Sequence, residues 1–209
     1  HTRYIGDWSS DVCSSDLYSA ETPIRWNTVA DDFRFRARAA VVGELGVERV
    51  QLTAETHCTL HSEGLFVALT GLEGAIRTRT SSEDVHQTRG VVTCHPGDPF
   101  ESMLRDVSLE TIRLPLHVLE RVARERLGES TVTFRMLGVA TLSDEASARW
   151  RSLSRYLQRE CGSDTTTLDH PLVAAALVDL VAATALSVFP TTALDPDYRP
   201  APGYAGPGS

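Results

Sequence analysis

The residues with the clearest chemical potential are two histidines four positions apart and a Cys-His pair before a Pro-Gly turn. His57 and His61 lie in "HCTLH", and Cys94 and His95 begin "CHPGDPF". Histidines four apart share one side of a helix and can bind one metal ion, but on a strand they lie roughly 13 Å apart, too far for one ion. The surrounding alternation predicts a strand, so we expect no metal site and no cofactor.

The cysteines and the missing motifs both argue against catalysis. The four cysteines, at positions 13, 58, 94 and 161, are widely spaced and include no C-x-x-C, so neither a zinc site nor a disulfide framework is indicated. The chain contains no G-x-S-x-G, P-loop or G-x-G-x-x-G motif, and no spacing selects a Ser-His-Asp triad. We therefore expect free thiols in a reducing cytoplasm, no catalytic residues, and no enzyme activity.

Short strands are expected to position these residues. In "VERVQLTAETHCTLH", residues 47–61, even-numbered positions from Val50 to Leu60 are mostly apolar and odd-numbered ones are polar. This period of two predicts a single strand with Thr56 and Cys58 on its inner side and His57 and His61 on its outer side. Further short apolar runs, separated by Gly and polar turns, continue to Pro115. Their regular spacing predicts a β-barrel over residues 24–114.

After Pro115 the apolar pattern becomes helical. Residues 115–128, 143–162 and 169–189 each read as a helix, and Ser143 is in position to cap the second. The second helix has an apolar stripe at spacings of four, three and four: Ala146, Trp150, Leu153 and Leu157. Strands followed by helices predict an α+β fold, a β-barrel followed by a helical hairpin or pair over residues 115–190.

Charge and hydropathy limit the partners. The net charge is −8, so we expect this stretch not to bind nucleic acid directly. Residues 171–189 are apolar enough to cross a membrane, but Asp179 interrupts them and no Lys or Arg flanks them. A helix that is apolar on most faces is typical of a buried core helix, and we expect no contact with a membrane.

The first seventeen residues do not resemble a folded domain. "DWSSDVCSSDL" contains three acids and no apolar run, which excludes a signal peptide. Trp8 to Leu17 back-translates to TGG-AGT-TCA-GAC-GTG-TGC-TCT-TCC-GAT-CT, which resembles the constant end of a short-read sequencing adapter. We interpret residues 1–17 as translated adapter sequence and expect them to be disordered.

Three segments, in order, carry a family resemblance. They are "HPGD" after the strands, "LPLHVLE" at the change to helices and "LDHPL" at the start of the last helix. Over residues 24–190 the chain resembles the N-terminal, cupin-like sensor domain of AraC/XylS-type transcription regulators. The metal-binding cupin pattern is absent, since "HCTLH" lacks a close H-x-H pair and His95 precedes the Pro-Gly turn.

The resemblance implies a domain that binds a small effector and forms a homodimer. Residues 18–190 would be this sensor, and the Pro- and Gly-rich residues 191–209 a linker, cut before a helix-turn-helix domain through which DNA is bound. On this basis the effector would contact barrel residues such as Thr56, Cys58 and Phe66. The partner protomer would contact the stripe Ala146, Trp150, Leu153 and Leu157, unless that stripe packs within its own protomer.

Two other functions remain open from sequence. One is a stand-alone cupin-like enzyme, an isomerase or a dioxygenase, which would require a bound metal. The other is an interaction barrel without a ligand, because a small barrel can be filled by its own side chains.

Overall fold

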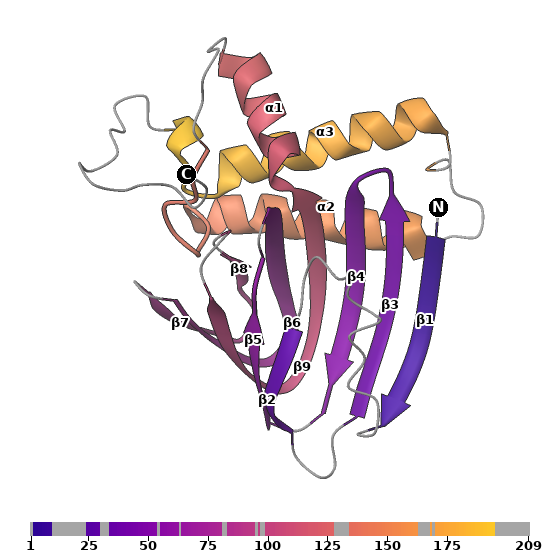
Figure 1. Cartoon of the computed structure of the whole chain (residues 1–209), viewed down its shortest axis with the longest axis vertical. Coiled ribbons are helices and arrows are strands. Elements are labelled where there is room, and N and C mark those ends of the chain that lie inside the picture. The colour runs from indigo at the N-terminus through magenta and orange to yellow at the C-terminus, as the bar shows by residue number, and fades with distance from the viewer. Residues whose placement is uncertain are drawn as a thin grey trace.

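The protein is an α+β fold in which a β-barrel is followed by helices packed against one of its faces (Figure 1). The computed structural model describes residues 2–9, 24–29, 34–53, 55–62, 64–80, 83–94, 96, 99–127, 134–162, 168 and 170–194. The predicted fold class is confirmed, and the change from strand to helix occurs between Pro115 and Leu116.

All strand pairings within the described residues are antiparallel. The order β1-β3-β4-β9-β5-β2 forms one path, and β6 pairs with β7, β8 and β9. The strands are β1 Thr2–Ser9, β2 Ile24–Val29, β3 Arg34–Val42, β4 Leu45–Leu52, β5 Glu55–Leu60, β6 Leu65–Arg79, β7 Asp84–Gln87, β8 Val91–Cys94 and β9 Phe100–Pro115.

The two longest strands, β6 and β9, bend the sheet into a barrel. The second half of β9 lies between β4 and β6, and its first half lies between β5 and β6. The bend falls where the β6–β9 register shifts and where Asp106 has a φ of 48°. Gly74 has a φ of 81° here, and an added Cβ would lie 2.4 Å from the Asp106 carbonyl oxygen, so this close approach requires glycine.

Three helices follow the barrel: α1 Leu116–Leu127, α2 Asp144–Gly162 and α3 Pro171–Val188. The predicted Ser143 cap is confirmed, because the Ala146 backbone N–H donates to Ser143 Oγ at 3.2 Å. At the start of α3, His170 Nδ1 accepts from the Leu172 N–H at 3.3 Å, and Pro171 follows in the first turn. A short 3-10 turn, η1, spans Thr192–Leu194, and the remaining linker residues 195–209 lie outside the described ranges.

Two local expectations are wrong. The alternating run 47–61 forms two strands, because the chain leaves β4 at Thr53 and resumes pairing as β5 at Glu55. In the N-terminal stretch predicted to be disordered, residues 2–9 form β1, paired with β3 from Thr2–Val41 to Ser9–Arg34. Backbone N–H and C=O groups along an open sheet edge pair with any extended segment, so such pairing does not require a selected sequence. Residues 10–17 lie outside the described part of the chain.

The apolar core has two parts, one on each face of the sheet. The helix-side core lies between the sheet and the helices, and Phe66, Trp150 and Phe189 form its aromatic centre with ring centroids 5.1–5.9 Å apart. The barrel interior lies between the two halves of the barrel, and its apolar residues include Val50, Leu52, Cys58, Ile76, Leu104, Leu109, Leu60, Val67, Cys94 and Phe100. The helices therefore close one face of the sheet and leave the barrel interior on the other.

The predicted dimerisation stripe packs inside the protomer. Trp150 and Leu157 are fully buried, Ala146 is 7% exposed, and Leu153 packs against the same core. Helical periodicity correctly places these residues on one apolar face, but the sheet of the same chain covers that face. The stripe therefore follows the alternative of packing within its own protomer, and a role for it in dimerisation stays a prediction.

Candidate ligand site inside the barrel

The half of the barrel farther from the helices, called the lower half, is formed by β5 with residues 75–79 of β6 and 100–105 of β9, and the half nearer the helices is called the upper half (Figure 1). The inner face of the lower half carries a row of small polar side chains. Cys58 pairs with Ser102, and Ser102 pairs with Thr78, so all three point to the same side of the sheet. The next row contains Thr56, paired with Leu104. Leu104 and Cys58 belong to the barrel interior, so both rows face inward.

Three hydroxyls on this face have no protein partner among the described residues. Thr56, Thr78 and Ser102 are 0%, 1% and 7% exposed, and no hydrogen bond reaches their side-chain oxygens. A buried hydroxyl without a partner costs about 1–3 kcal/mol. Three such groups in adjoining rows form a polar surface that a ligand with hydrogen-bonding groups can satisfy.

A buried ion pair lies in the upper half of the barrel. Glu48 is on β4 with the parity of inward-facing Val50, and its Oε1 lies 2.6 Å from Arg113 Nη2 of β9. Burial raises the pKa of Glu48 although the nearby Arg113 charge opposes the shift. The Arg113 guanidinium lies over Gly46, where an added Cβ would be 2.9 Å from Nε. A polar ligand in the upper half of the barrel would meet opposite charges on adjacent strands.

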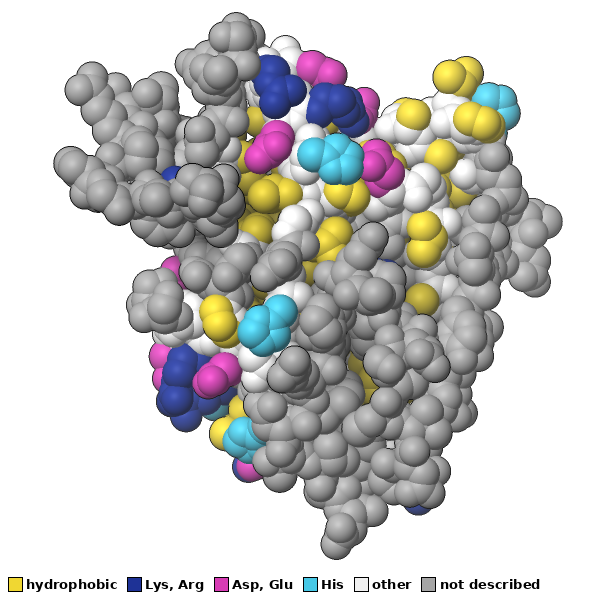
Figure 2. All heavy atoms as spheres, in the orientation of Figure 1, with side chains coloured by type: hydrophobic (Ala, Val, Ile, Leu, Met, Phe, Trp, Pro, Cys, Tyr) yellow, Lys and Arg dark blue, Asp and Glu magenta, His cyan; other side chains and the backbone are white. Residues whose placement is uncertain are grey.

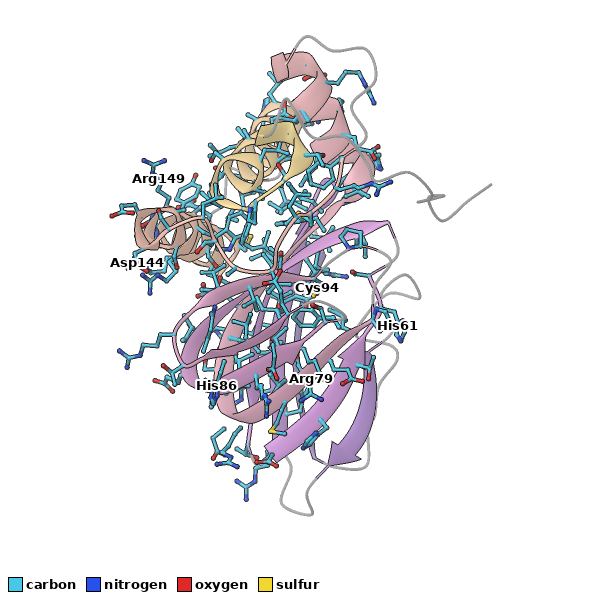
Figure 3. The ribbon with its side chains drawn as sticks, turned by 90° about the vertical axis from the view of Figure 1, so that its left-hand side faces the viewer. His61, Arg79, His86, Cys94, Asp144 and Arg149 are labelled. Atoms are coloured by element: carbon cyan, nitrogen blue, oxygen red, sulfur yellow. The ribbon has the colours of Figure 1, made fainter. Side chains whose placement is uncertain are left out.

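The interior thiols are not nucleophiles. Burial raises the pKa of Cys58 to about 12, and burial together with neighbouring Cys58 raises the pKa of Cys94 well above its ordinary value. Figure 3 shows Cys94 within the barrel, just below the helices. Both side chains remain neutral thiols at neutral pH and act as small apolar lining.

The outer face of the lower half carries the predicted polar residues. His57 is on this side beside Glu55, 3.5 Å away. A hollow of about 260 Å³ is lined by the outward-facing His57, Arg77, Arg79, Glu101 and Met103, together with the inward-facing Cys58 and Ser102. Figure 2 shows charged side chains gathered over this part of the barrel, at lower left. Two hydrogen bonds from Arg77, at 3.0 and 2.6 Å, lower the pKa of Asp84.

Within the described ranges, no group of three His, Cys, Asp or Glu side chains is close enough to hold a metal ion.

The sequence-predicted ligand residues separate in the structure. Thr56 and Cys58 line the interior as expected, and their role in binding stays a prediction. Phe66 does not face the interior: it packs against Trp150 and Phe189 in the helix-side core. Residues 65–68 are all buried, so both faces of β6 are apolar and the sequence offers no alternation to assign the inward side.

Four further interior polar residues carry no signal in the sequence that marks them as part of a site. They are Glu48, Thr78, Ser102 and Arg113. Charged and hydroxyl residues are usually exposed, so each alone is typical of a solvated strand face. Only the pairing of β9 with both β4 and β6 brings them into one enclosure.

A family model decides the relationship to known proteins. The model of the AraC-binding-like domain matches residues 14–187, most of the chain. This chain belongs to that family. The sequence resemblance is thereby confirmed, and the cupin-like barrel and following helices are those of an AraC-binding-like domain. A search of curated proteins found no match.

Three solved structures match this chain at low sequence identity, and the first of them shares its fold. The AraC-like transcriptional activator CuxR has 14% identity and a TM-score of 0.59, over 81% of this chain and 63% of that one. A predicted oxalate decarboxylase from Thermotoga maritima has 14% identity and a TM-score of 0.36, over 47% and 96%. KdgF from Halomonas sp. has 12% identity and a TM-score of 0.35, over 44% and 87%. The present AraC-binding-like domain thus spans less than two thirds of the CuxR chain.

Proposed function

We propose that this AraC-binding-like domain is the effector-sensing and dimerisation part of a cytoplasmic transcription regulator and has no catalytic activity. The observation that carries the proposal is the inward-facing set of unpartnered hydroxyls at Thr56, Thr78 and Ser102. A small molecule bound there favours one arrangement of the barrel and helices over another. In this proposal DNA is bound by a separate helix-turn-helix domain of the regulator.

Thermal unfolding in the presence of neutral sugars and of aromatic acids tests the barrel site. A ligand present at one hundred times its Kd adds about 2.7 kcal/mol of stability, which raises the Tm by roughly 5–10 °C for a chain of this size. We expect Thr56→Val or Thr78→Val to remove most of that shift, because valine keeps the shape and loses the hydroxyl. Thr59→Val, on the outer face of the same strand as Thr56, should keep it.

A Tm shift that survives both inner-face variants would contradict the barrel site. Metal analysis of the purified protein separates sensing from the enzyme alternative. Stoichiometric iron, manganese or zinc would favour a cupin-like enzyme and count against the proposed sensor. A barrel with no ligand would show no shift with any compound of either class.

The dimer surface in this proposal is the outer side of α3. Leu172 is 75% exposed and Leu180 49%, and Val173 is also exposed. Figure 2 shows apolar side chains along this helix at upper right. α3 is long and apolar enough to span a membrane, and 39% of that segment, including Val181, is buried within the protomer. An apolar surface of this kind is stabilised when a second copy covers it.

Replacing the exposed leucines should separate the protomers without unfolding them. We expect Leu172→Asp/Leu180→Asp to shift the molar mass from dimer to monomer in light scattering after size exclusion, because each Asp would be buried without a partner in the dimer. Since both side chains point away from the core, the Tm of the protomer should stay close to that of a matched control, Leu142→Asp, which is exposed outside α3. A double variant that remains dimeric would contradict the α3 interface.

A further inference from the structure

Five arginines on one flank of α2 and on the strands and loop next to it have no carboxylate within ion-pair distance among the described residues. They come from three parts of the chain: Arg38 and Arg49 in β3 and β4, Arg89 before β8, and Arg151 and Arg155 in α2. We call them the arginine strip. All are exposed except Arg151, which is half-buried.

Sheet register places Arg38 and Arg49 on the side of the sheet that α2 covers. Arg49 pairs in register with Arg38 on one side and Glu110 on the other, so all three side chains leave the same face. Glu110 is buried under α2, where Ser154 Oγ donates to it at 2.5 Å. Arg49 and Arg38 continue this row away from the helix and into solvent.

One flank of α2 joins these arginines to the others. Trp150 and Leu157 face the sheet, and Leu153 packs toward the core that α3 shares. Arg151 and Arg155 follow on the opposite flank, one helical turn apart. On this flank Arg151 Nη1 donates to the Arg89 carbonyl at 3.3 Å, and Gln158 Nε2 donates to the Glu48 carbonyl of β4 at 2.7 Å. The strip therefore runs from Arg89 along α2 to β4 and β3.

Several arginines elsewhere in the protein do contact a carboxylate. Arg77, Arg105, Arg113 and Arg121 each contact a carboxylate, namely Asp84, Glu55, Glu48 and Asp179 respectively. The chain has 28 acidic residues and only 20 basic ones, so carboxylates are not scarce. Arg38 and Arg49 lie directly opposite each other, and like charges in that position destabilise a strand pair. An anionic partner would remove this repulsion.

We propose that the arginine strip binds an acidic segment of another polypeptide. Charge complementarity supports the partner's sign, since carboxylates match guanidinium groups in charge and geometry. The size of the strip favours a peptide over nucleic acid. An extended segment of about six residues covers roughly 20 Å, the scale of a strip built along one helix. A DNA duplex would extend beyond it over a chain whose net charge is −8.

Fluorescence anisotropy with a dye-labelled hexaglutamate peptide tests this surface on the whole chain. We expect binding that weakens as salt increases, because exposed charges are screened beyond about 10 Å at 0.1 M ionic strength. Arg38→Glu/Arg49→Glu should weaken binding about tenfold, the effect of reversing two exposed charges. The matched control is Arg124→Glu, which changes an exposed arginine on α1 that makes no ion pair with the described residues, and it should leave the affinity within about twofold.

Several results would overturn the proposal. The wild-type chain could fail to bind the peptide, or the Arg124 variant could lose as much affinity per charge as the strip variant, which would show a net-charge effect only. Tighter binding of a 30-base-pair duplex than of the peptide would identify nucleic acid as the partner. Circular dichroism melts of both variants must match the wild type, and Arg155→Gln provides a milder strip variant if Arg38→Glu/Arg49→Glu unfolds.

Discussion

Replacing Trp150 by alanine is expected to destabilise the protein by about 3–5 kcal/mol, the typical result of removing a buried aromatic side chain. Trp150 is fully buried and contacts Phe66 from β6 and Phe189 from the end of α3 in edge-on geometry. The substitution therefore opens a cavity where sheet, α2 and the chain after α3 meet. Because natural domains are stable by only about 5–15 kcal/mol, the variant should lie near the limit of folding. Urea unfolding followed by circular dichroism measures the loss.

Two further variants test whether the lost aromatic packing causes the destabilisation of Trp150→Ala. Trp150→Phe keeps a ring in the cavity and removes an indole N–H that has no partner among the described residues, so it should cost much less. Tyr156→Ala, on the same helix but 38% exposed, should change the free energy of unfolding by less than about 1 kcal/mol. If Trp150→Ala instead left the stability unchanged and abolished a dimer, Trp150 would be an interface residue and its buried placement would be wrong.

The fold could be predicted because its signals are local. Ser143 caps α2 as its sequence position indicates, and the helical apolar period after Pro115 corresponds to three helices. The break between β4 and β5 was not predictable, because residues on both sides of it keep the same alternation. The bend of β6 and β9 depends on Gly74 meeting the backbone at Asp106, a contact between residues distant in sequence.

The candidate site was only partly predictable, for a related reason. A period of two separates the faces of a strand, and it correctly placed Thr56 and Cys58 on the inner side of β5. The same rule fails for Phe66 because a strand covered by helices on one face and by the barrel on the other loses its alternation. The periodicity of a helix or strand shows which residues lie on the same face of it. The tertiary fold decides what covers that face, as the sheet of the same chain covers the face of α2 that carries Trp150.

The ion pair between Glu48 and Arg113 is the second large effect we predict. At pH 8, Arg113→Met should cost about 3–5 kcal/mol, because it leaves Glu48 buried without its opposite charge. Glu48→Leu/Arg113→Met should recover most of that loss, since apolar side chains of similar volume often replace buried ion pairs without penalty. Recovery would mean that the pair is not required for stability, which under the proposed function leaves ligand binding as the reason for burying two charges in the barrel.

The pH dependence of the same variant has a definite sign. Burial raises the pKa of Glu48 in the folded state above its ordinary value of 4.5, so the folded protein keeps a proton that the unfolded chain releases. Stability therefore falls as the pH rises from about 4.5 through the folded-state pKa. Arg113 opposes the raised pKa of Glu48, so removing Arg113 raises that pKa further and extends to higher pH the range over which stability falls.

We expect the difference in unfolding free energy between Arg113→Met and wild type to be small near pH 4, where Glu48 is protonated in both states, and to grow toward pH 8. The double variant should show a flat difference. A cost of Arg113→Met that is equally large at pH 4 would instead indicate lost packing over Gly46, because a protonated carboxyl no longer needs the guanidinium charge.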